Sequence, residues 1–353
     1  MSGNNQHFIP QFLQRGFASH KLGKTAYTWA FQKNQDPLNE RIRDIGAQDA
    51  FYTQADDTTV DDVITQAENH FGNLVNRLRT YPAGPVFEEE IPGFVAHLEV
   101  RTRHIRKSFS ENASYLVLRL LDFISDTDRF VAVIQRRLAN DPLWLRSRII
   151  AEVRKQPQPP RDLSSHVNRL MKVARASMPA ILEAQRPSIA MTAILLKAQL
   201  PLLLERSAKD GHLRALRNSI QPEARSRMFT ELKFRVVDVA PSDFVLGDSA
   251  AVFCVSGVRP YRPYTEKGDS ISAVFLPLGP HRVLIGEHEI AEWDYSMIKR
   301  QAARCSLEYF IAHENTAANR ALESEIGLDA SLLTESELEG IAVESFRQFE
   351  APE

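Results

Sequence analysis

The chain has 353 residues, of which 43% are hydrophobic and 25% are charged, and its formal net charge is −2. These are ordinary globular values, so a packed core is feasible, and no fixed-period repeat is present. The two cysteines, Cys254 and Cys305, exclude a disulfide framework and favour a reducing compartment. The polar start MSGNNQHFIP has no apolar segment of the kind that a secretory signal needs, so we expect a cytoplasmic protein.

The first predicted element is a short helix that begins at Pro10, where the missing N–H of proline costs nothing. Phe12, Leu13 and Phe17 would share one face of this segment, and we expect all three to be buried. The residues 25–31 (TAYTWAF) are β-branched or aromatic and predict a strand.

A long helical region follows. Apolar residues recur at helical spacing and prolines or aspartates mark the breaks, which predicts helices over 60–78, 89–109, 113–140, 142–155 and 164–206. The longest apolar run, 189–204, carries Lys197 and Pro201 and is too short for a membrane span. We therefore expect this run to be a buried core helix, and we expect no membrane partner.

The pattern then changes to strands over 232–239, 244–255 and 271–285, with prolines and glycines between them. Helices are expected again over 287–313 and, as an acidic amphipathic helix, over 332–349. This order predicts an α+β fold: a mostly helical body with a smaller antiparallel β-sheet that includes the N-terminal strand. We expect a single domain over 1–353, divided into an N-terminal motif and strand (1–55), a helical body (56–230), a β subdomain (231–286) and C-terminal helices (287–353).

Charge is segregated along the chain. Residues 36–99 hold 13 acidic and 4 basic residues, residues 101–175 hold 7 acidic and 16 basic, and residues 323–353 hold 9 acidic and 1 basic. The basic segment could bind an anionic partner such as nucleic acid, or the acidic helices of the same chain could neutralise it.

Several segments, in this order, resemble an uncharacterised bacterial family, domain-of-unknown-function family forty-two thirty-eight. Members share an N-terminal HxxPxFxLxxF-like motif, a Phe-Tyr pair, a helical Glu, an Arg-Thr pair, a late Ser-Asp-Asn-Pro turn and a Pro-Leu strand. The matching residues here are His7, Pro10, Phe12, Phe17, Phe51, Tyr52, Glu68, Arg101, Thr102, Gly247, Asp248, Ser249, Ala250, Pro277 and Leu278. The sequence departs from the pattern at Gln14, Ser249 and Ala250. The resemblance implies an organisation and candidate positions, and no activity.

Two of these positions are candidate catalytic residues. His7 could act as a general base, or its ring could bond a nearby backbone group and pin the N-terminus to the sheet. Asp248 follows a strand in a Gly-Asp-Ser turn, where working residues are often held, although aspartate also forms turns by bonding the local backbone.

Arg101 and Arg103, with Arg106 nearby, are candidate anion-binding residues, because a guanidinium fork matches phosphate or carboxylate geometry. On one continuous helix, Arg101 and His104 would share a face. The alternative is an internal ion pair with Glu68, Glu99 or Asp122.

Phosphate-loop, dinucleotide-binding, zinc-protease, hydrolase and kinase signatures are absent, and the ten histidines are scattered without metal-ligand spacing. We therefore predict no metal site, and the sequence names no cofactor and no oligomeric state.

Two functions stay open. The first is a non-enzymatic ligand- or protein-binding module, for example in a bacterial stress or phage-defence locus. The second is an enzyme, such as a nuclease, that acts on a phosphate-containing substrate through His7, Arg101 and Asp248 converging on one pocket.

Overall fold

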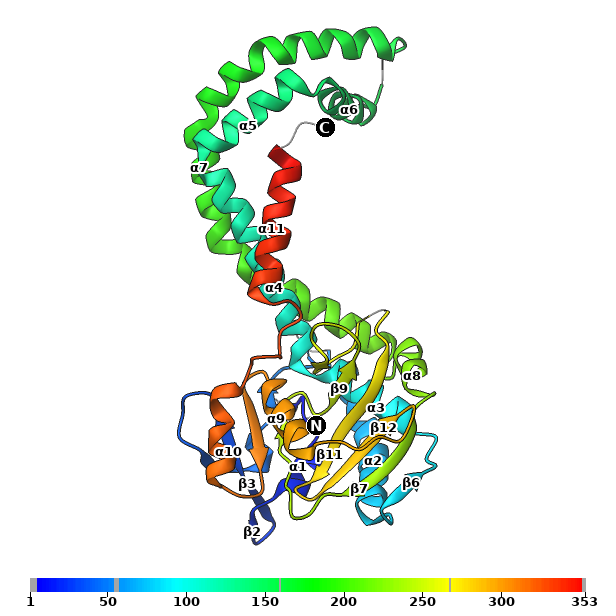
Figure 1. Cartoon of the computed structure of the whole chain (residues 1–353). Helices are drawn as coiled ribbons and strands as arrows, with labels where there is room; N and C mark the ends of the chain where they lie inside the picture. The colour runs from blue at the N-terminus through cyan, green and yellow to red at the C-terminus, as the bar shows by residue number, and fades with distance from the viewer. Residues whose placement is uncertain (1–4, 54–56, 159, 267, 351–353) are drawn as a thin grey trace. The chain divides into compact units, whose positions relative to one another are not determined.

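The computed structural model describes residues 5–53, 57–158, 160–266 and 268–350 (Figure 1). The chain divides into two compact units, one formed by residues 1–109 with 207–332 and the other by residues 110–206 with 333–353. Helices hold 55% and strands 17% of the residues, and the sheets are antiparallel, so the fold class is α+β as predicted. That the two units behave as a single domain stays a prediction.

The first unit holds a sheet that joins distant parts of the sequence. Its order is β2-β3-β13-β8, with β4 paired to the other side of β3. Its strands are β2 (His20–Leu22), β3 (Thr25–Gln32), β4 (Leu38–Arg41), β8 (Leu246–Gly247) and β13 (Tyr309–Ala312). The predicted N-terminal strand is confirmed as β3. The predicted helix over 287–313 is wrong at its end, because helix α9 (Tyr295–Arg304) stops and the β-rich segment YFIA pairs with β3 instead.

A second sheet has the order β10-β9-β11-β12-β7-β6. Its strands are β6 (Gly84–Val86), β7 (Lys233–Asp238), β9 (Val252–Val255), β10 (Tyr261–Arg262), β11 (Ile271–Gly279) and β12 (Arg282–Glu287). The predicted run 271–285 is therefore a hairpin of two strands. A separate two-stranded ribbon pairs β1 (Asn5–His7) with β5 (Ala47–Asp49), and it carries the N-terminal motif.

Helices cover these sheets in the first unit. They are α1 (Gln11–Gln14), η1 (Arg15–Phe17), η2 (Ile42–Asp44), α2 (Thr59–Thr80), α3 (Ile91–Arg101), α8 (Glu223–Phe229), α9, α10 (Ala317–Ala321) and η3 (Glu323–Glu325). The expected helix over 89–109 is broken at Thr102, whose ψ of 163° is extended. The Thr102 hydroxyl donates to the carbonyl oxygen of Glu99, 3.2 Å away, and such a bond competes with helical pairing. Arg101 therefore ends α3, and α4 (Arg103–Ser125) begins at Arg103.

The N-terminal motif is part of the core. Leu13 and Phe17 are fully buried, as predicted. Phe12 is only partly buried, and its ring packs against Phe94 at a centroid distance of 6.1 Å. The segment joins the apolar face of α2, where Phe71 is buried, to the sheets.

The second unit is helical. It contains most of α4, then α5 (Thr127–Asn140), α6 (Pro142–Arg154), α7 (Leu163–Asn218) up to residue 206, and α11 (Glu335–Glu350). The predicted helix over 113–140 is split because the Asp126 side chain accepts from the backbone N–H of Arg129 and caps α5. Acidic α11 pairs with the basic segment through Glu339, whose carboxylate lies 2.6 Å from Arg119.

Helix α7 corrects two expectations. The predicted helix over 164–206 is too short, because α7 continues to Asn218. The apolar run 189–204, expected in a core, is mostly exposed: within one window of 18 residues the mean hydropathy is 1.5 and only 6% is buried. By length and composition α7 could cross a membrane, so the expectation of no membrane partner loses its original support.

Candidate functional site

His7 ends strand β1, opposite Ala47 of β5. Its Nε2 atom donates to the carbonyl oxygen of Arg43 at 3.0 Å, and Gln11 approaches its Nδ1 atom at 3.5 Å. Partial burial lowers the pKa of His7, although the Arg43 carbonyl works in the opposite direction. The ring therefore ties the motif to the η2 turn, which is the structural role weighed for it above.

Arg101 lies at the centre of a buried charged cluster. Its side chain is fully buried, and its Nη2 atom lies 2.6 Å from the Glu68 carboxylate and 2.5 Å from the carbonyl oxygen of His7. Its Nε atom donates to the Tyr52 hydroxyl at 3.3 Å, and that hydroxyl donates to the Arg101 carbonyl at 3.2 Å. Burial acts to lower the pKa of Arg101, but Tyr52 and Glu68 outweigh it, so the guanidinium stays charged.

A neutral histidine completes this cluster. Burial, followed by the charge of Arg101, lowers the pKa of His97 to about 3. The Nδ1 atom of His97 lies 3.1 Å from the carbonyl oxygen of Ile220 and must donate to it. Its Nε2 atom is then an acceptor, and Nη1 of Arg101 donates to it at 3.2 Å. Each of these groups around Arg101 thus has a defined partner.

Asp248 follows β8 and is 2% exposed. Its carboxylate accepts from the backbone N–H groups of Leu307 at 2.6 Å and Glu308 at 2.9 Å, just before strand β13. Its Oδ1 atom lies 3.6 Å from Nε2 of His104, which is closer to the Cys305 carbonyl oxygen at 2.8 Å. Burial raises the pKa of Asp248 and lowers that of His104. The aspartate therefore orients the turn that leads into β13.

The turn after β8 also departs from the resemblance in its backbone. Ala250 has a φ of +62°, in the left-handed region. The resemblance aligns this position with a proline, whose ring holds φ near −65°. A proline could not adopt this conformation, so this turn differs from the aligned pattern in geometry as well as in residue type.

Arg103 lines a pocket beside the buried cluster. Its Nη1 atom lies 2.5 Å from one oxygen of Glu308, and Lys107 lies 3.1 Å from the other. Burial acts to raise the pKa of Glu308, but Arg103 and Lys107 outweigh it and hold that pKa below its ordinary value. The pocket has a volume of about 190 Å³. Its lining residues are Phe8, Ala30, Gln32, Asp36, Leu38, Glu40, Asp44, Ile45, Gly46, Ala47, Arg103, Glu308 and Tyr309.

The charge of this pocket is predominantly negative. Among the described residues, four carboxylates and one guanidinium line it. Asp44 is neutralised by Arg41 at 2.5 Å, and Glu308 by Arg103. Within the described ranges, neither Asp36 nor Glu40 has an ion-pair partner. Two uncompensated carboxylates therefore remain at this pocket.

Tyr309 forms the inner wall. Its hydroxyl is buried and has no hydrogen-bond partner among the described residues. Burial, and then the nearby Asp248, raises the pKa of Tyr309 well above its ordinary value, so the hydroxyl keeps its proton and can donate. Gly46 makes room for it, because a Cβ atom at this position would lie 2.8 Å from the Tyr309 hydroxyl oxygen.

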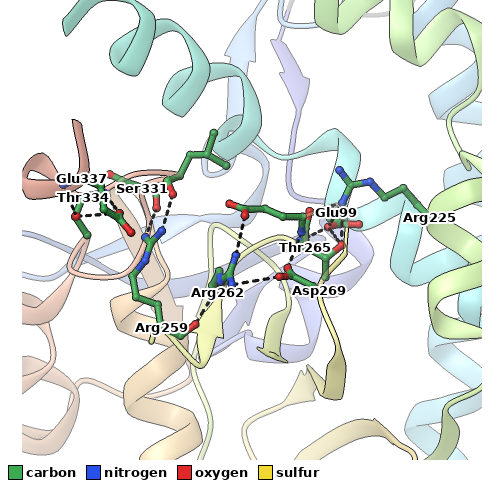
Figure 2. Close-up of polar contacts among 11 residues, drawn as sticks. Glu99, Arg225, Arg259, Arg262, Thr265, Asp269, Ser331, Thr334 and Glu337 are labelled. Atoms are coloured by element: carbon green, nitrogen blue, oxygen red, sulfur yellow. Dashed lines mark hydrogen bonds and ion pairs between the residues drawn. The ribbon is translucent and has the colours of Figure 1, made fainter. Parts of the chain in front are cut away.

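A second buried carboxylate lies elsewhere in the same unit (Figure 2). Glu99 is 1% exposed, and one of its oxygens accepts from Arg225 at 2.8 Å and from the backbone N–H of Thr265 at 2.5 Å. At the start of the loop that holds Thr265, the guanidinium of Arg262 lies 3.2 Å from the carboxylate of Asp269. These contacts fasten the segment between β10 and β11 onto α3 and α8, and the cluster has a structural explanation.

The structure brings some of the predicted residues together. The positions His7, Tyr52, Glu68 and Arg101, which the resemblance marked separately, form one cluster. Asp248 uses other partners, and it approaches the pocket through the backbone of Glu308 rather than through Arg101. Because the helix breaks at Thr102, the expected shared face of Arg101 and His104 does not form.

Sequence reasoning missed Glu308, Tyr309, Glu40 and Asp36. A correct assignment of β13 as a strand beside β3 would have placed Tyr309 opposite Gln32, at the pocket. No group of three or more histidine, cysteine, aspartate or glutamate residues in the described part of the chain could hold a metal ion.

The chain matches a protein-family model. No curated protein and no solved structure matches the chain. The model of the family described as "Protein of unknown function (DUF4238)" matches residues 5–304, which include the whole Arg101 cluster and Asp248 and stop just before Glu308 and Tyr309. Because the match extends over most of the sequence, the chain belongs to the DUF4238 family of proteins of unknown function.

Proposed function

We propose that this protein is a binding module whose pocket beside Arg103 receives a small cationic group, an amine or a guanidinium carried by a partner molecule. The observation that carries the proposal is the excess of carboxylates around a cavity of about 190 Å³. A cationic group entering it would meet Asp36 and Glu40, neither of which is neutralised by a base in the described chain. Opposite charges at close range favour such binding.

The walls of the pocket supply shape and selectivity. Phe8 and Ile45 are buried apolar residues, and the guanidinium of Arg103 lies 5.2 Å from the Phe8 ring centre. The carboxylate of Glu308, already shared by two bases, has less capacity for a third. A lysine or arginine side chain of a protein partner has the combination of apolar stem and charged head that this lining suits. This supports a protein-binding module.

The enzyme alternative has less support. A catalytic group must reach the reacting atoms, whereas Arg101 is fully buried and is bonded to Glu68, and Asp248 is bonded to two backbone amides. A phosphate substrate would also meet an acidic pocket. A role in a bacterial stress or phage-defence locus is compatible with a protein-binding module, and it belongs to the same proposal.

Isothermal titration calorimetry of the full chain at low salt tests the proposal with two cationic probes, N-acetyl-arginine amide and N-acetyl-lysine amide, and with inorganic phosphate. We expect at least one cationic probe to bind and phosphate not to bind. Glu40→Gln should weaken the cation about fivefold to tenfold, the effect of roughly 1 kcal/mol for one charge at close range in a hydrated site.

Glu89→Gln is the matched control, since Glu89 is an exposed carboxylate outside this pocket. It should leave the affinity unchanged. Binding of phosphate without binding of either cation would refute the proposal, and so would an equal loss of cation affinity in the two variants.

A further inference from the structure

Helix α7 presents an apolar stripe that the pocket does not explain. Between residues 181 and 202, seven positions follow one another at alternating spacings of three and four. They are Ile181, Ala184, Ser188, Met191, Leu195, Ala198 and Leu202, called here the α7 seam, and all are exposed. Leu195 is 56% and Leu202 is 60% exposed. A seam of this spacing over three heptads is typical of a helix that packs lengthwise against another helix.

The opposite face of α7 is already occupied within its own unit. Lys197 lies 2.7 Å from Asp122 of α4, Arg186 forms an ion pair with Asp128 of α5, and Ala193 is 1% exposed. These residues lie about half a turn from the seam at 3.6 residues per turn. The seam therefore faces away from the helices that pack on α7.

The sequence of the seam favours a helix over a lipid surface. Helices that lie in a bilayer interface usually combine tryptophan or phenylalanine on one face with many basic residues on the other. The 56-residue helix α7 contains no aromatic residue, and Lys197, the one charged residue between Pro187 and Leu204, is paired with Asp122. Pro187 and Pro201 lie beside the seam, and the helix runs through both.

We propose that the α7 seam binds the same seam of a second copy of this chain, with the two helices antiparallel. A two-fold axis between Ile189 and Ala190 makes each pairing combine a large and a small residue. Ile181 meets Ala198, Ala184 meets Leu195, and Ser188 meets Met191 of the other copy; Leu202 meets Ser177. Such self-complementarity is what a symmetric interface requires, since residue i contacts j while j contacts i.

Charge and size agree with this pairing. The seam itself carries no charge, so two copies bring no like charges together along it. At each end Glu205 comes opposite Ala174 of the other copy, next to Arg175, so the terminal charges are of opposite sign. The seam is about 33 Å long and about 10 Å wide, so it covers about 330 Å² on each copy and about 660 Å² on the two copies together. That area is below the range of stable specific interfaces and is typical of weak, transient contacts, so we expect a dissociation constant in the high-micromolar range.

Sedimentation velocity of the full chain, from low to high micromolar concentration, should show a monomer–dimer equilibrium. Leu195→Lys should shift it to monomer, with at least a tenfold loss of affinity. Leu196→Lys is the matched control, since Leu196 is the neighbouring exposed leucine but lies off the seam. Monomer at all concentrations, or an equal effect of the two variants, would overturn the proposal. Circular dichroism of each variant verifies that the helices form.

Cysteine cross-linking tests the direction of the helices. Both native cysteines are buried. The double variant Ala184→Cys, Leu195→Cys should form an intermolecular disulfide, because in an antiparallel pair each new cysteine faces the other type. Ala184→Cys alone should not cross-link, whereas a parallel pair would cross-link it. Cross-linking of the single variant, or flotation of the wild-type protein with phosphatidylserine vesicles in place of dimerisation, would contradict the inference.

Discussion

Arg101 and Arg103 are separated by one residue, yet they lie in opposite surroundings. Arg101 ends α3, is fully buried, and is bonded by Glu68, Tyr52, His97 and a backbone carbonyl. Arg103 begins α4, its side chain is 26% exposed, and it lines a pocket with Glu308. The break at Thr102 turns the chain. The Arg101 guanidinium therefore lies in the buried cluster with Glu68, Tyr52 and His97, called here the frame, whereas the Arg103 guanidinium lies at the partly exposed pocket. The same residue type is therefore fully buried in one case and lines a pocket in the other.

The largest expected effect is on the frame. Arg101→Ala leaves Glu68 and the His7 carbonyl without their buried cation, and removing one partner of a buried pair costs about 3–5 kcal/mol of the free energy of unfolding. Urea unfolding at neutral pH measures this loss of unfolding free energy. Arg103→Ala, in a partly exposed pair, should cost less than about 1 kcal/mol. Equal losses in the two variants would remove the distinction between frame and surface.

Much of the frame could be predicted from the sequence, because its signals are local. The strand 25–31 and the helix around Phe71 follow from side-chain periodicity, and the order of elements gave the α+β class. The residues of the Arg101 cluster were identified singly, as Tyr52, Glu68 and Arg101, by the resemblance. Their convergence could not be derived, since it depends on where β1 and α2 meet α3.

The pocket beside Arg103 and the exposed face of α7 were harder to predict, for physical reasons. Tyr309 was assigned to a helix because its segment follows a strongly helical pattern, and only pairing with β3 makes it a strand. Asp36 lies just before β4 and Glu40 lies within it. Neither belongs to an apolar pattern, and an acidic side chain usually means solvent exposure. The exposure of Leu195 and Leu202 contradicts the expectation that long apolar runs are buried, which holds only where a partner element exists in the same chain.

A pH titration sharpens the account of the frame. The pKa of His97 is about 3 in the fold and near 6.5 when unfolded. Between these values the unfolded chain binds the extra proton, so stability is complete above pH 6.5 and falls as the pH drops. Each such proton contributes a slope of about 1.4 kcal/mol per pH unit. His212, with a pKa of about 4, adds a slope of the same sign.

Urea unfolding at several pH values between 7 and 5 measures this slope. His97→Gln, which keeps an acceptor for Arg101 but cannot titrate, should reduce the slope by about one proton. An unchanged slope in that variant would show that His97 is not the neutral acceptor described for it.

A pair of glycine variants probes the wall between frame and pocket. Gly46 and Gly23 have similar positive φ values, +68° and +60°, but a Cβ atom at Gly46 would crowd Tyr309 while one at Gly23 would meet nothing. Each alanine should cost about 1 kcal/mol for its conformation. Gly46→Ala should cost about 1–2 kcal/mol more through overpacking. Melting curves measure the difference in stability between the two variants. Equal losses would mean that the Tyr309 side chain moves aside at no cost in free energy.

The most direct test of the account is the sign of the charge that the pocket accepts. In titrations of Arg103→Ala beside the wild type, with N-acetyl-arginine amide and with inorganic phosphate, removal of the guanidinium that lines the pocket should tighten binding of the cation. The expected change is roughly fivefold, about 1 kcal/mol for one like charge at close range, with phosphate still not bound. The opposite result, phosphate binding to the wild type and lost in Arg103→Ala, would make Arg103 an anion-binding residue and contradict a cation-binding pocket.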